Sequence, residues 1–466
     1  MFSPETYIKR RAELKKRLGK GVVLLLGNDL VGMNYRDNEY EFRQDSTFLY
    51  YFGLNHDGLN AVIDVDNDRD IIFGDELTID AIVWTGNLPT LHEQAAKVGV
   101  TDVRPSSELR NYLDKAREAA SPIHYIPYYR ADHELKLMQL LGLQPSGIVP
   151  SVPLIRAVVD MRNHKSAEEI AEIEKACAVT AMMHKAAMAA ARPGLTEYQM
   201  KAIVEKVATE NGMRCSFPTI ATVHGEILHN HTYNNTLQSG QLFLLDAGAE
   251  TAMGYAGDMS STCPVDLRYT DRQKAIYDLQ QAASRDAVAM LRPGVPFRDV
   301  HMQAARTIAT GLKDMGIMKG DIEEAINAGA HAMFFPTGLG HMMGLDVHDM
   351  ENLGEVWVGY DGQPKSTVFG FKSLRLARPL EEGYVFTIEP GIYFMPELTE
   401  LWKSEGRHKD FINFEEAEKW LGFGGVRNEE DYLVTADGHR RLGPGIPMTT
   451  EEVEDLRVKN QESRTK

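Results

Sequence analysis

The sequence predicts an α+β protein in which a smaller α/β domain precedes a larger domain made of two related halves. The chain has 466 residues, which is long for a single hydrophobic core. Short β-rich runs alternate with helical stretches up to about residue 160, and several pairs of similar segments then recur in a constant order. We therefore expect an N-terminal domain over residues 1–160 and a C-terminal domain over residues 161–466.

The N-terminal domain is predicted from its apolar runs. Residues 22–26, 61–65 and 71–73 are apolar or β-branched and are bounded by Gly, Asn or Asp, as buried strands are. Residues 91–97 and 107–119 have helical patterns. This region contains no evident catalytic cluster, and the proline-bearing stretch 145–153 is a candidate linker.

The first half of the C-terminal domain opens with two capped helices. Ser166 and Glu169 form a capping box, in which each side chain bonds the other residue's backbone N–H. We expect this helix to end before the Arg-Pro-Gly at residues 192–194. Thr196 and Gln199 repeat the capping pattern for a second helix.

The second half repeats this order. A helix is predicted over residues 273–291 before another Arg-Pro-Gly at 292–294, and a second helix over residues 297–315. A Phe-Pro-Thr follows each helix pair, at residues 217–219 and 335–337. Because the matching segments keep their order, we infer an internal duplication, each half being helix–helix–sheet.

Each half then offers a strand that ends in a carboxylate. Residues 240–248 and 383–391 both run from Gly through apolar residues to an acid followed by x-Gly. The acids are Asp246 and Glu389. Two halves related by a pseudo-twofold axis would bring them face to face, and paired acids in an apolar setting indicate a shared metal or proton because an unpaired buried charge is costly.

Further candidate ligands lie near these two acids. Asp258 is a hairpin's distance from Asp246, and the acidic run 429–431 offers a partner for Glu389. The Gly-rich segment 337–349 lies between them and contains histidines. Carboxylates with an imidazole suit Mn²⁺, Fe²⁺, Co²⁺ or Zn²⁺ in a two-metal site, in which two ions lower the pKa of a shared water.

These motifs carry a resemblance to a known family. The segments LLDAGAE, YAGDMSST, GLGHMMGLDVHD, TIEPGIYF and GGVRNEEDYLVT resemble the pita-bread metallopeptidases of the aminopeptidase P and prolidase branch, and FRQDSTFLYYFG resembles that branch's N-terminal module. The resemblance implies a pita-bread fold and two divalent ions, with Mn the expected metal and Co, Zn or Fe the alternatives. It implies five metal ligands: Asp246, Asp258, His341, Glu389 and Glu429.

The resemblance also implies catalytic and substrate-binding roles. Glu389 would exchange a proton during the attack of water, His348 would stabilise the oxyanion, and His229 would contact substrate. The substrate-binding residues would be Arg375, Arg427 and Thr337. Arg375 resembles the prolidase arginine that holds a dipeptide's C-terminal carboxylate, a group that an arginine fork binds well. Thr337 stands where the family usually has histidine.

The favoured functional hypothesis is an Xaa-Pro dipeptidase. The alternative is an Xaa-Pro aminopeptidase acting on longer peptides, and a third hypothesis is a pita-bread binding protein with little catalysis. The net charge of −17 argues against nucleic acid or anionic membrane as partner. Three scattered cysteines and the lack of a signal or membrane-spanning run predict a cytoplasmic protein, and the family resemblance implies a homo-oligomer, a dimer or tetramer.

Overall fold

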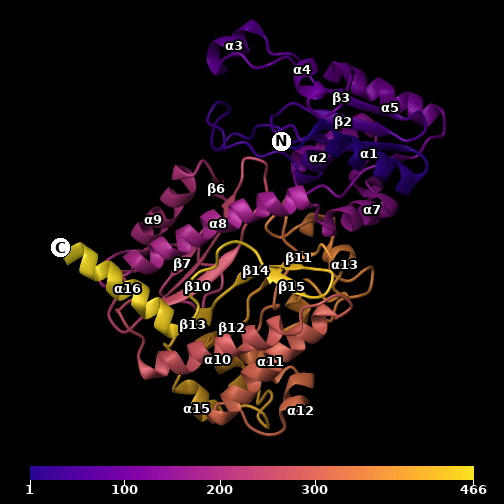
Figure 1. Ribbon diagram of the computed structural model, residues 1–466. Helices are drawn as coiled ribbons and strands as arrows, with labels where there is room; N and C mark the ends of the chain where they lie inside the picture. Colours follow the sequence, from indigo (N-terminus) through magenta and orange to yellow (C-terminus); the bar gives the residue numbers. More distant parts are fainter. Residues whose placement is uncertain (466) are drawn as a thin grey trace. The chain divides into compact units, whose positions relative to one another are not determined.

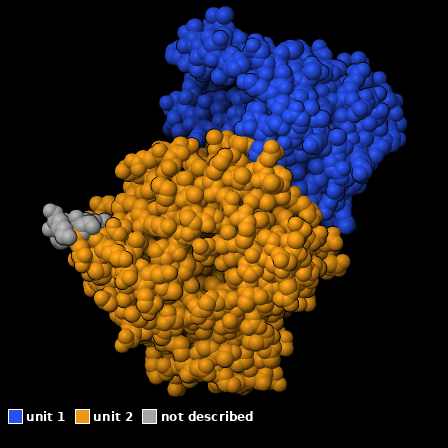
Figure 2. Space-filling model, viewed as in Figure 1, with its two compact units in different colours: residues 1–162, 350–357 blue, residues 163–349, 358–466 orange. Residues whose placement is uncertain are grey.

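The computed structural model describes the backbone of residues 1–465 and the side chains of residues 1–462. The chain forms two compact units, shown in different colours in Figure 2. Unit 1 comprises residues 1–162 together with 350–357, and unit 2 comprises residues 163–349 together with 358–466. Within the described residues, no helix is both long and apolar enough to cross a membrane.

Unit 1 is built on a mixed five-stranded sheet in the order β4-β3-β2-β1-β5. β2 pairs antiparallel with both β1 and β3, whereas β4 and β5 are added parallel at the two edges. The three predicted strands are confirmed, with small shifts at the ends of two of them. The strands are β1 (Val22–Leu26), β2 (Asn60–Asp64), β3 (Arg69–Phe73), β4 (Asp102–Arg104) and β5 (Ile123–His124).

Helices bury both faces of this sheet, which explains its continuous apolar runs. Val22 and Leu24 face the side covered by α5 (Leu109–Glu118) and α6 (Ala131–Leu141). The alternate side chains of a strand point to the opposite face, and there α1 (Pro4–Leu18) and α2 (Ser46–Phe52) contact β1 and β2. The remaining helices of this unit are α3 (Ile79–Thr85), α4 (Leu91–Ala96) and α7 (Val152–Asn163), whose last residue opens unit 2.

The predicted linker is partly wrong. Residues 145–147 form a 3₁₀ turn, and α7 already begins at Val152, so that Pro153 is its second residue. Proline is tolerated in the first turn of a helix because the N–H it lacks would have no intrahelical partner there. A proline-bearing stretch therefore starts this helix.

Unit 2 contains the two predicted helix pairs, visible in Figure 1 as α8 beside α9 and α10 beside α11. α8 (Ala167–Ala190) and α9 (Glu197–Glu210) begin at the predicted capping boxes. In the second pair, α10 (Asp271–Val288) starts at a further capping box and ends slightly earlier than expected, and α11 (Phe297–Asp314) lies as predicted.

The strands of unit 2 form small antiparallel sheets that repeat one plan. In each half, the strand that contains or leads to the first acid pairs antiparallel with the strand that follows the second acid: β8 with β10, and β11 with β14. The sheets have the orders β10-β8-β7, β11-β14-β15, β12-β13 and β6-β9. Their strands are β6 (Arg214–Cys215), β7 (Ile220–Thr222), β8 (Leu242–Ala247), β9 (Ala249–Glu250), β10 (Met259–Pro264), β11 (Val385–Ile388), β12 (Gly391–Tyr393), β13 (Gly425–Arg427), β14 (Glu430–Val434) and β15 (His439–Arg441).

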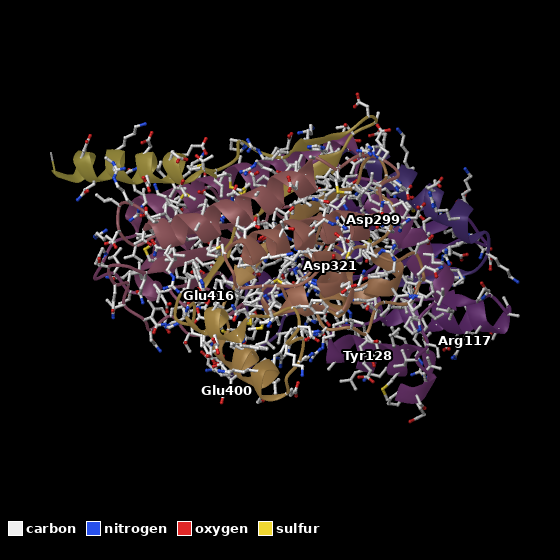
Figure 3. The ribbon with its side chains drawn as sticks, turned by 90° about the horizontal axis from the view of Figure 1, so that it is seen from below. Arg117, Tyr128, Asp299, Asp321, Glu400 and Glu416 are labelled. Atoms are coloured by element: carbon white, nitrogen blue, oxygen red, sulfur yellow. The ribbon has the colours of Figure 1, made fainter. Side chains whose placement is uncertain are left out.

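The periphery of unit 2 is helical and acidic. Asp299, Asp321 and Glu400 lie exposed on its surface, in keeping with the negative net charge (Figure 3). Short helices α12 (Ile322–Asn327), α13 (Glu355–Val358, shared with unit 1), α14 (Pro396–Ser404) and α15 (Phe414–Glu418) and the C-terminal α16 (Thr450–Thr465) complete the chain.

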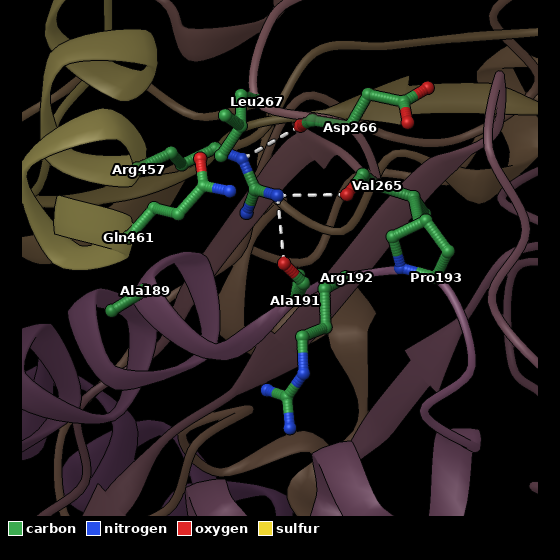
Figure 4. A pocket seen from close by; sticks show the side chains of 9 residues that line it. All are labelled: Ala189, Ala191, Arg192, Pro193, Val265, Asp266, Leu267, Arg457 and Gln461. Atoms are coloured by element: carbon green, nitrogen blue, oxygen red, sulfur yellow. Dashed lines mark hydrogen bonds between the residues drawn. The ribbon is translucent and has the colours of Figure 1, made fainter. Parts of the chain in front are cut away.

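α16 is anchored by a buried arginine beside a surface cavity of about 420 Å³ (Figure 4). The guanidinium of Arg457 donates to the backbone carbonyls of Ala191, Val265 and Asp266. These bonds join α16 to the end of α8 and to the segment after β10. None of the predicted site residues lines this cavity.

Candidate metal centre

Strand register brings the acids of each half together. In the first half Ser260 lies opposite Asp246, which places Asp258 just beyond the end of the β8–β10 pairing. In the second half Ile388 lies opposite Glu430, so Glu389 and Glu429 leave that ladder at the same end. Each half of unit 2 thus places two carboxylates at one end of its paired strands.

The two halves are joined at these same residues. The backbone N–H of Glu429 donates to the carbonyl of Ser260 at 3.0 Å, and the Ser260 hydroxyl donates to Glu429 Oε2 at 2.8 Å. The Thr262 hydroxyl also donates to the backbone carbonyl of Arg427 and accepts from the backbone N–H of Arg427. β10 and β13 are therefore held edge to edge, which brings the acid pairs of the two halves together.

His341 completes a compact group with the acids. Its Nε2 lies 3.4 Å from Asp258 Oδ2 and 3.7 Å from Glu389 Oε1. One ligand atom each from Asp258, His341 and Glu429 lies within 4.8 Å of the others, and all three residues are buried. This spacing suits a metal ion that all three could bind.

The hydrogen bonding of His341 prepares its Nε2 as a ligand. Its Nδ1 lies 3.1 Å from the carbonyl oxygen of Met342, which can only accept, so Nδ1 carries the proton. Burial lowers the pKa of His341 well below its ordinary value, which keeps the ring neutral. A neutral imidazole with Nδ1–H tied to the backbone is the usual state of a metal-binding histidine.

The carboxylates strongly repel one another. Burial raises the pKa of Asp258 well above its ordinary value, and the neighbouring charges of Glu429 and Asp246 add to the effect. Burial also raises the pKa of Glu429, with Glu389 as the next cause, and raises that of Glu389 to about 7. So many buried acids need a cationic partner to ionise together.

Two buried carboxylate oxygens are available to bind such a cation. The Oδ1 atoms of Asp246 and Asp258 are buried and make no hydrogen bond within the described chain. Buried polar atoms normally have partners. Unsatisfied carboxylate oxygens beside an imidazole fit divalent first-row metal ions, so these residues pass the chemical test for a metal site.

Arg427 contacts the first acid. Its Nη2 donates to Asp246 Oδ2 at 2.7 Å, its Nε to the Ser260 hydroxyl at 2.9 Å and its Nη1 to the Tyr393 hydroxyl at 3.0 Å. All three guanidinium nitrogens thus have protein partners. These contacts hold Asp246 in place, and the substrate-binding role of Arg427 stays a prediction.

Three other predicted site residues, His348, His229 and Arg375, interact with this centre. The ring of His348 lies 4.1 Å from that of His341, centroid to centroid. Partial burial lowers the pKa of His229, and Arg427 and Arg375 contribute to the shift. The charge of Arg375 also acts on His341 and Glu389. The Thr337 hydroxyl is buried and makes no hydrogen bond within the described chain.

Several supporting residues escaped the sequence reasoning. Ser260 and Tyr393 lie inside the motifs quoted above. Strand register accounts for their contacts with Arg427, because Ser260 lies opposite Asp246 and Arg427 lies opposite Gly391, close to Tyr393. Asp431 accepts from the backbone N–H of Asp258 at 3.2 Å and from the Cys177 thiol at 3.1 Å. The Cys177 contact joins α8 to the second half and has no signal in the sequence.

Comparison with known proteins decides the family. The model of metallopeptidase family M24 matches residues 171–436, more than half of the chain, and the model of the aminopeptidase P N-terminal domain matches residues 7–124. The chain belongs to metallopeptidase family M24. Its duplicated unit 2 is the pita-bread architecture, and it is a metal-dependent peptidase of this family, as the sequence predicted.

Relatives of two kinds match this M24 chain over nearly its whole length. The Xaa-Pro aminopeptidase of Escherichia coli K12 is 29% identical and covers 98% of both chains. The Xaa-Pro dipeptidase of Homo sapiens is 30% identical over 93% of this chain and 88% of its own. The structure of Pseudomonas aeruginosa aminopeptidase PepP superposes with a TM-score of 0.82 at 27% identity, covering 99% of each chain.

Proposed function

We propose that this protein hydrolyses Xaa-Pro peptide bonds and prefers dipeptides. The single observation that supports the dipeptide preference is that the charge of Arg375 acts on His229, His341 and Glu389 together. A dipeptide bound with its scissile carbonyl at the centre has its C-terminal carboxylate only one residue away. An arginine there would form an ion pair with that carboxylate. A longer peptide has an uncharged amide after its proline, so it would gain no comparable ion pair.

Two divalent ions would be held by four carboxylates and one imidazole: Asp246, Asp258, Glu389, Glu429 and His341. When bound, such ions supply Lewis acidity and a water of lowered pKa. Glu389 would accept a proton from the attacking water and return it to the leaving proline nitrogen. His348 donates a hydrogen bond to the carbonyl oxygen as negative charge develops there. Arg427 keeps Asp246 oriented through the reaction.

Proline sets the substrate class. Its ring nitrogen has no N–H when it forms a peptide bond, and its φ is fixed. A site that recognises this bond must accept a tertiary amide and protonate its nitrogen as the bond breaks. Glu389, which would lie next to the scissile carbonyl, would donate that proton.

The test compares Ala-Pro with Ala-Pro-Ala-Ala on the Mn²⁺-loaded enzyme and on Arg375→Ala. We expect the wild type to have the higher kcat/KM on the dipeptide. We expect Arg375→Ala to lose about 10- to 100-fold on the dipeptide, the value of a charged hydrogen-bonded contact, and little on the tetrapeptide. Arg378→Ala is the matched control, because Arg378 pairs with Glu381 three residues away. Dipeptide hydrolysis untouched by Arg375→Ala would contradict the clamp.

A second candidate is an Xaa-Pro aminopeptidase acting on longer peptides. It is favoured by the likeness, over nearly the whole length of both chains, to the Escherichia coli aminopeptidase and to the Pseudomonas aeruginosa structure. Equal or better turnover of Ala-Pro-Ala-Ala by the wild type would select this function over the dipeptidase.

We propose Mn²⁺ as the working ion, with Co²⁺, Zn²⁺ and Fe²⁺ as the alternatives. The support is the ligand set, four carboxylates to one imidazole, which is rich in hard oxygen donors. Reconstituting the metal-free protein with each ion in turn and measuring Ala-Pro hydrolysis tests the choice. A markedly higher kcat with Zn²⁺ than with Mn²⁺ would contradict it.

We also propose that the protein is a homo-oligomer. The support is helix α3 (Figure 1), whose Ile79, Val83 and Trp84 side chains are 76%, 76% and 87% exposed. Large apolar side chains gathered on one exposed segment are typical of interaction surfaces. Light scattering should give a mass of two or more chains, which Trp84→Asp lowers. A monomeric wild type would contradict this proposal.

A further inference from the structure

A buried ion pair lies behind the histidine loop. Lys165 Nζ is 2.9 Å from Asp349 Oδ2, and each side chain is only 1% exposed. Taking both charges out of water is costly, and an apolar pair of similar size would often stabilise a protein as well or better. Stability alone therefore does not account for this pair, and its position in the chain suggests what it does.

Asp349 ends the segment that carries both histidines of the centre. The backbone from Leu339 to Met343 runs beside β11: Glu389 N–H donates to Leu339 O, Thr387 N–H to His341 O, and Met343 N–H to Val385 O. The segment then turns back, so that the N–H of Asp349 donates to Met342 O at 2.9 Å. His348 is the residue immediately before this anchor.

Lys165 is bonded to the backbone just before the same strand. Its backbone N–H donates to the carbonyl of Gly383 at 3.0 Å, at the start of the stretch that leads through β11 to Glu389. Its side chain reaches Asp349. One residue thus ties the base of the Glu389 strand to the end of the His348 loop.

The loop is shaped around the pair. A Cβ on Gly344 would lie 2.8 Å from both Asp349 Oδ2 and Lys165 Cε, closer than real Cβ contacts. The carbonyl of Gly344 also accepts the N–H of Ala256, two residues before Asp258. The loop therefore packs directly against the ion pair at Gly344, so a change in one would displace the other.

We propose that the Lys165–Asp349 ion pair positions His348 against His341 and the Glu389 strand. Both are positioning residues, and the effect on turnover rests on the proposed function. The remaining acids, Asp246, Asp258 and Glu429, are held by β8, β10, β13 and their partners, so breaking the pair moves the His348 loop and leaves most of the ligand set in place.

The test uses Lys165→Met, which removes the charge and keeps the chain length, and the double variant Lys165→Met/Asp349→Leu. We expect Lys165→Met to lose at least about tenfold in kcat on Ala-Pro per folded molecule, because small misplacements of a catalytic group are costly, with KM changed less than about twofold. The apolar double variant should recover thermal stability without recovering kcat. Lys403→Met breaks an exposed ion pair with Glu418 and is the matched control.

A second readout is independent of turnover. The imidazole Cε1–H resonance of His348, assigned with His348→Gln, should shift in both the single and the double variant of the metal-free protein and stay unchanged in Lys403→Met. A double variant with wild-type kcat and an unmoved His348 resonance would overturn the positioning role. A wild type that cleaves no Xaa-Pro peptide would overturn the proposed function, and the resonance shift would still decide the role of the pair.

Discussion

At the scale of single residues, Glu389 is held in a site that opposes its ionisation. Burial raises its pKa to about 7 in the metal-free protein, from an ordinary 4.5. The folded state then binds a proton that the unfolded state has released, so stability falls as pH rises from about 4.5 to about 7. Glu389→Gln removes this penalty.

We expect metal-free Glu389→Gln to be more stable than the wild type at pH 7.5, by on the order of 1 to 3 kcal/mol, and to show little advantage at pH 4.5. Urea denaturation in the presence of a chelator, repeated across this pH range, measures the difference. A variant less stable than the wild type at pH 7.5 would show that ionised Glu389 does not destabilise the folded metal-free protein.

The orphan hydroxyl of Thr337 gives a second prediction at this scale. A buried hydroxyl without a partner costs about 1 to 3 kcal/mol, so Thr337→Val should raise the stability of the ligand-free protein by roughly 1 kcal/mol. If the hydroxyl finds its partner in the substrate, the same change lowers kcat/KM on Ala-Pro. Thermal unfolding and steady-state kinetics check both parts, and unchanged kinetics would remove Thr337 from the substrate site.

The residue scale shows where prediction from sequence stops. The carboxylates and His341 stand in motifs whose resemblance to the family implied that they are ligands. The partners of Arg427 did not follow from the motifs, because Asp246 and Ser260 reach it only through the packing of β10 against β13. Lys165 was missed for the same reason: its partner Asp349 lies 184 positions away in the chain.

At the scale of elements, local signals were sufficient for helix starts and insufficient for sheet arrangement. Ser166 and Thr196 cap their helices as their side-chain chemistry requires. The division of the strands into separate small sheets depends on contacts between distant segments. The first two residues of α7 were assigned to the linker because Pro153 signals a break and a helix start equally well.

One prediction belongs to the loop that lies along β11. A Cβ on Gly340 would meet the carbonyl oxygen of Thr387 at 2.0 Å, so Gly340→Ala must push His341 away from the strand. We expect a loss of about 1 to 3 kcal/mol in stability and a lower metal affinity. Gly438→Ala is the control, since its Cβ would contact nothing closer than 3.9 Å. Chemical denaturation and metal titration measure both, and equal behaviour of the two variants would contradict the close approach.

At the scale of the whole molecule, buried histidines make the fold sensitive to acid. His301 and His331 pack together with Phe335 and Phe371, and their ring nitrogens have no hydrogen-bond partner within the described chain. Burial lowers the pKa of His301 to about 3, with His331 adding to the shift, and that of His331 to about 4, with His408 adding. Below about pH 6.5 the unfolded chain binds protons that the folded chain refuses, so stability is lost as pH falls towards 4.

We expect His301→Phe to flatten this acid loss by on the order of 3 kcal/mol between pH 6.5 and 4, since phenylalanine fits the same aromatic surroundings and cannot bind a proton. Denaturation curves of the metal-free protein at several pH values give the slope, with His231→Phe as an exposed control. An unchanged slope would mean that these rings are hydrated in solution.

Whole-molecule features were predicted unevenly. The duplication was visible because matched signals recur in order along the chain. The grouping of residues 350–357 with unit 1 was not, since nothing in that short segment distinguishes it from the loop it follows. The acidic balance was read directly from composition, and exposed acids such as Asp299 carry it.

The central claim is that these acids and His341 make a metal-dependent site for the Xaa-Pro bond. The most direct measurement is a Mn²⁺ titration of metal-free protein that follows hydrolysis of Ala-Pro and of Ala-Ala. We expect no cleavage without metal, cleavage of Ala-Pro that saturates at two equivalents of Mn²⁺ per chain, and far slower cleavage of Ala-Ala. Cleavage of Ala-Pro by the metal-free protein, or none at any level of metal, would contradict it.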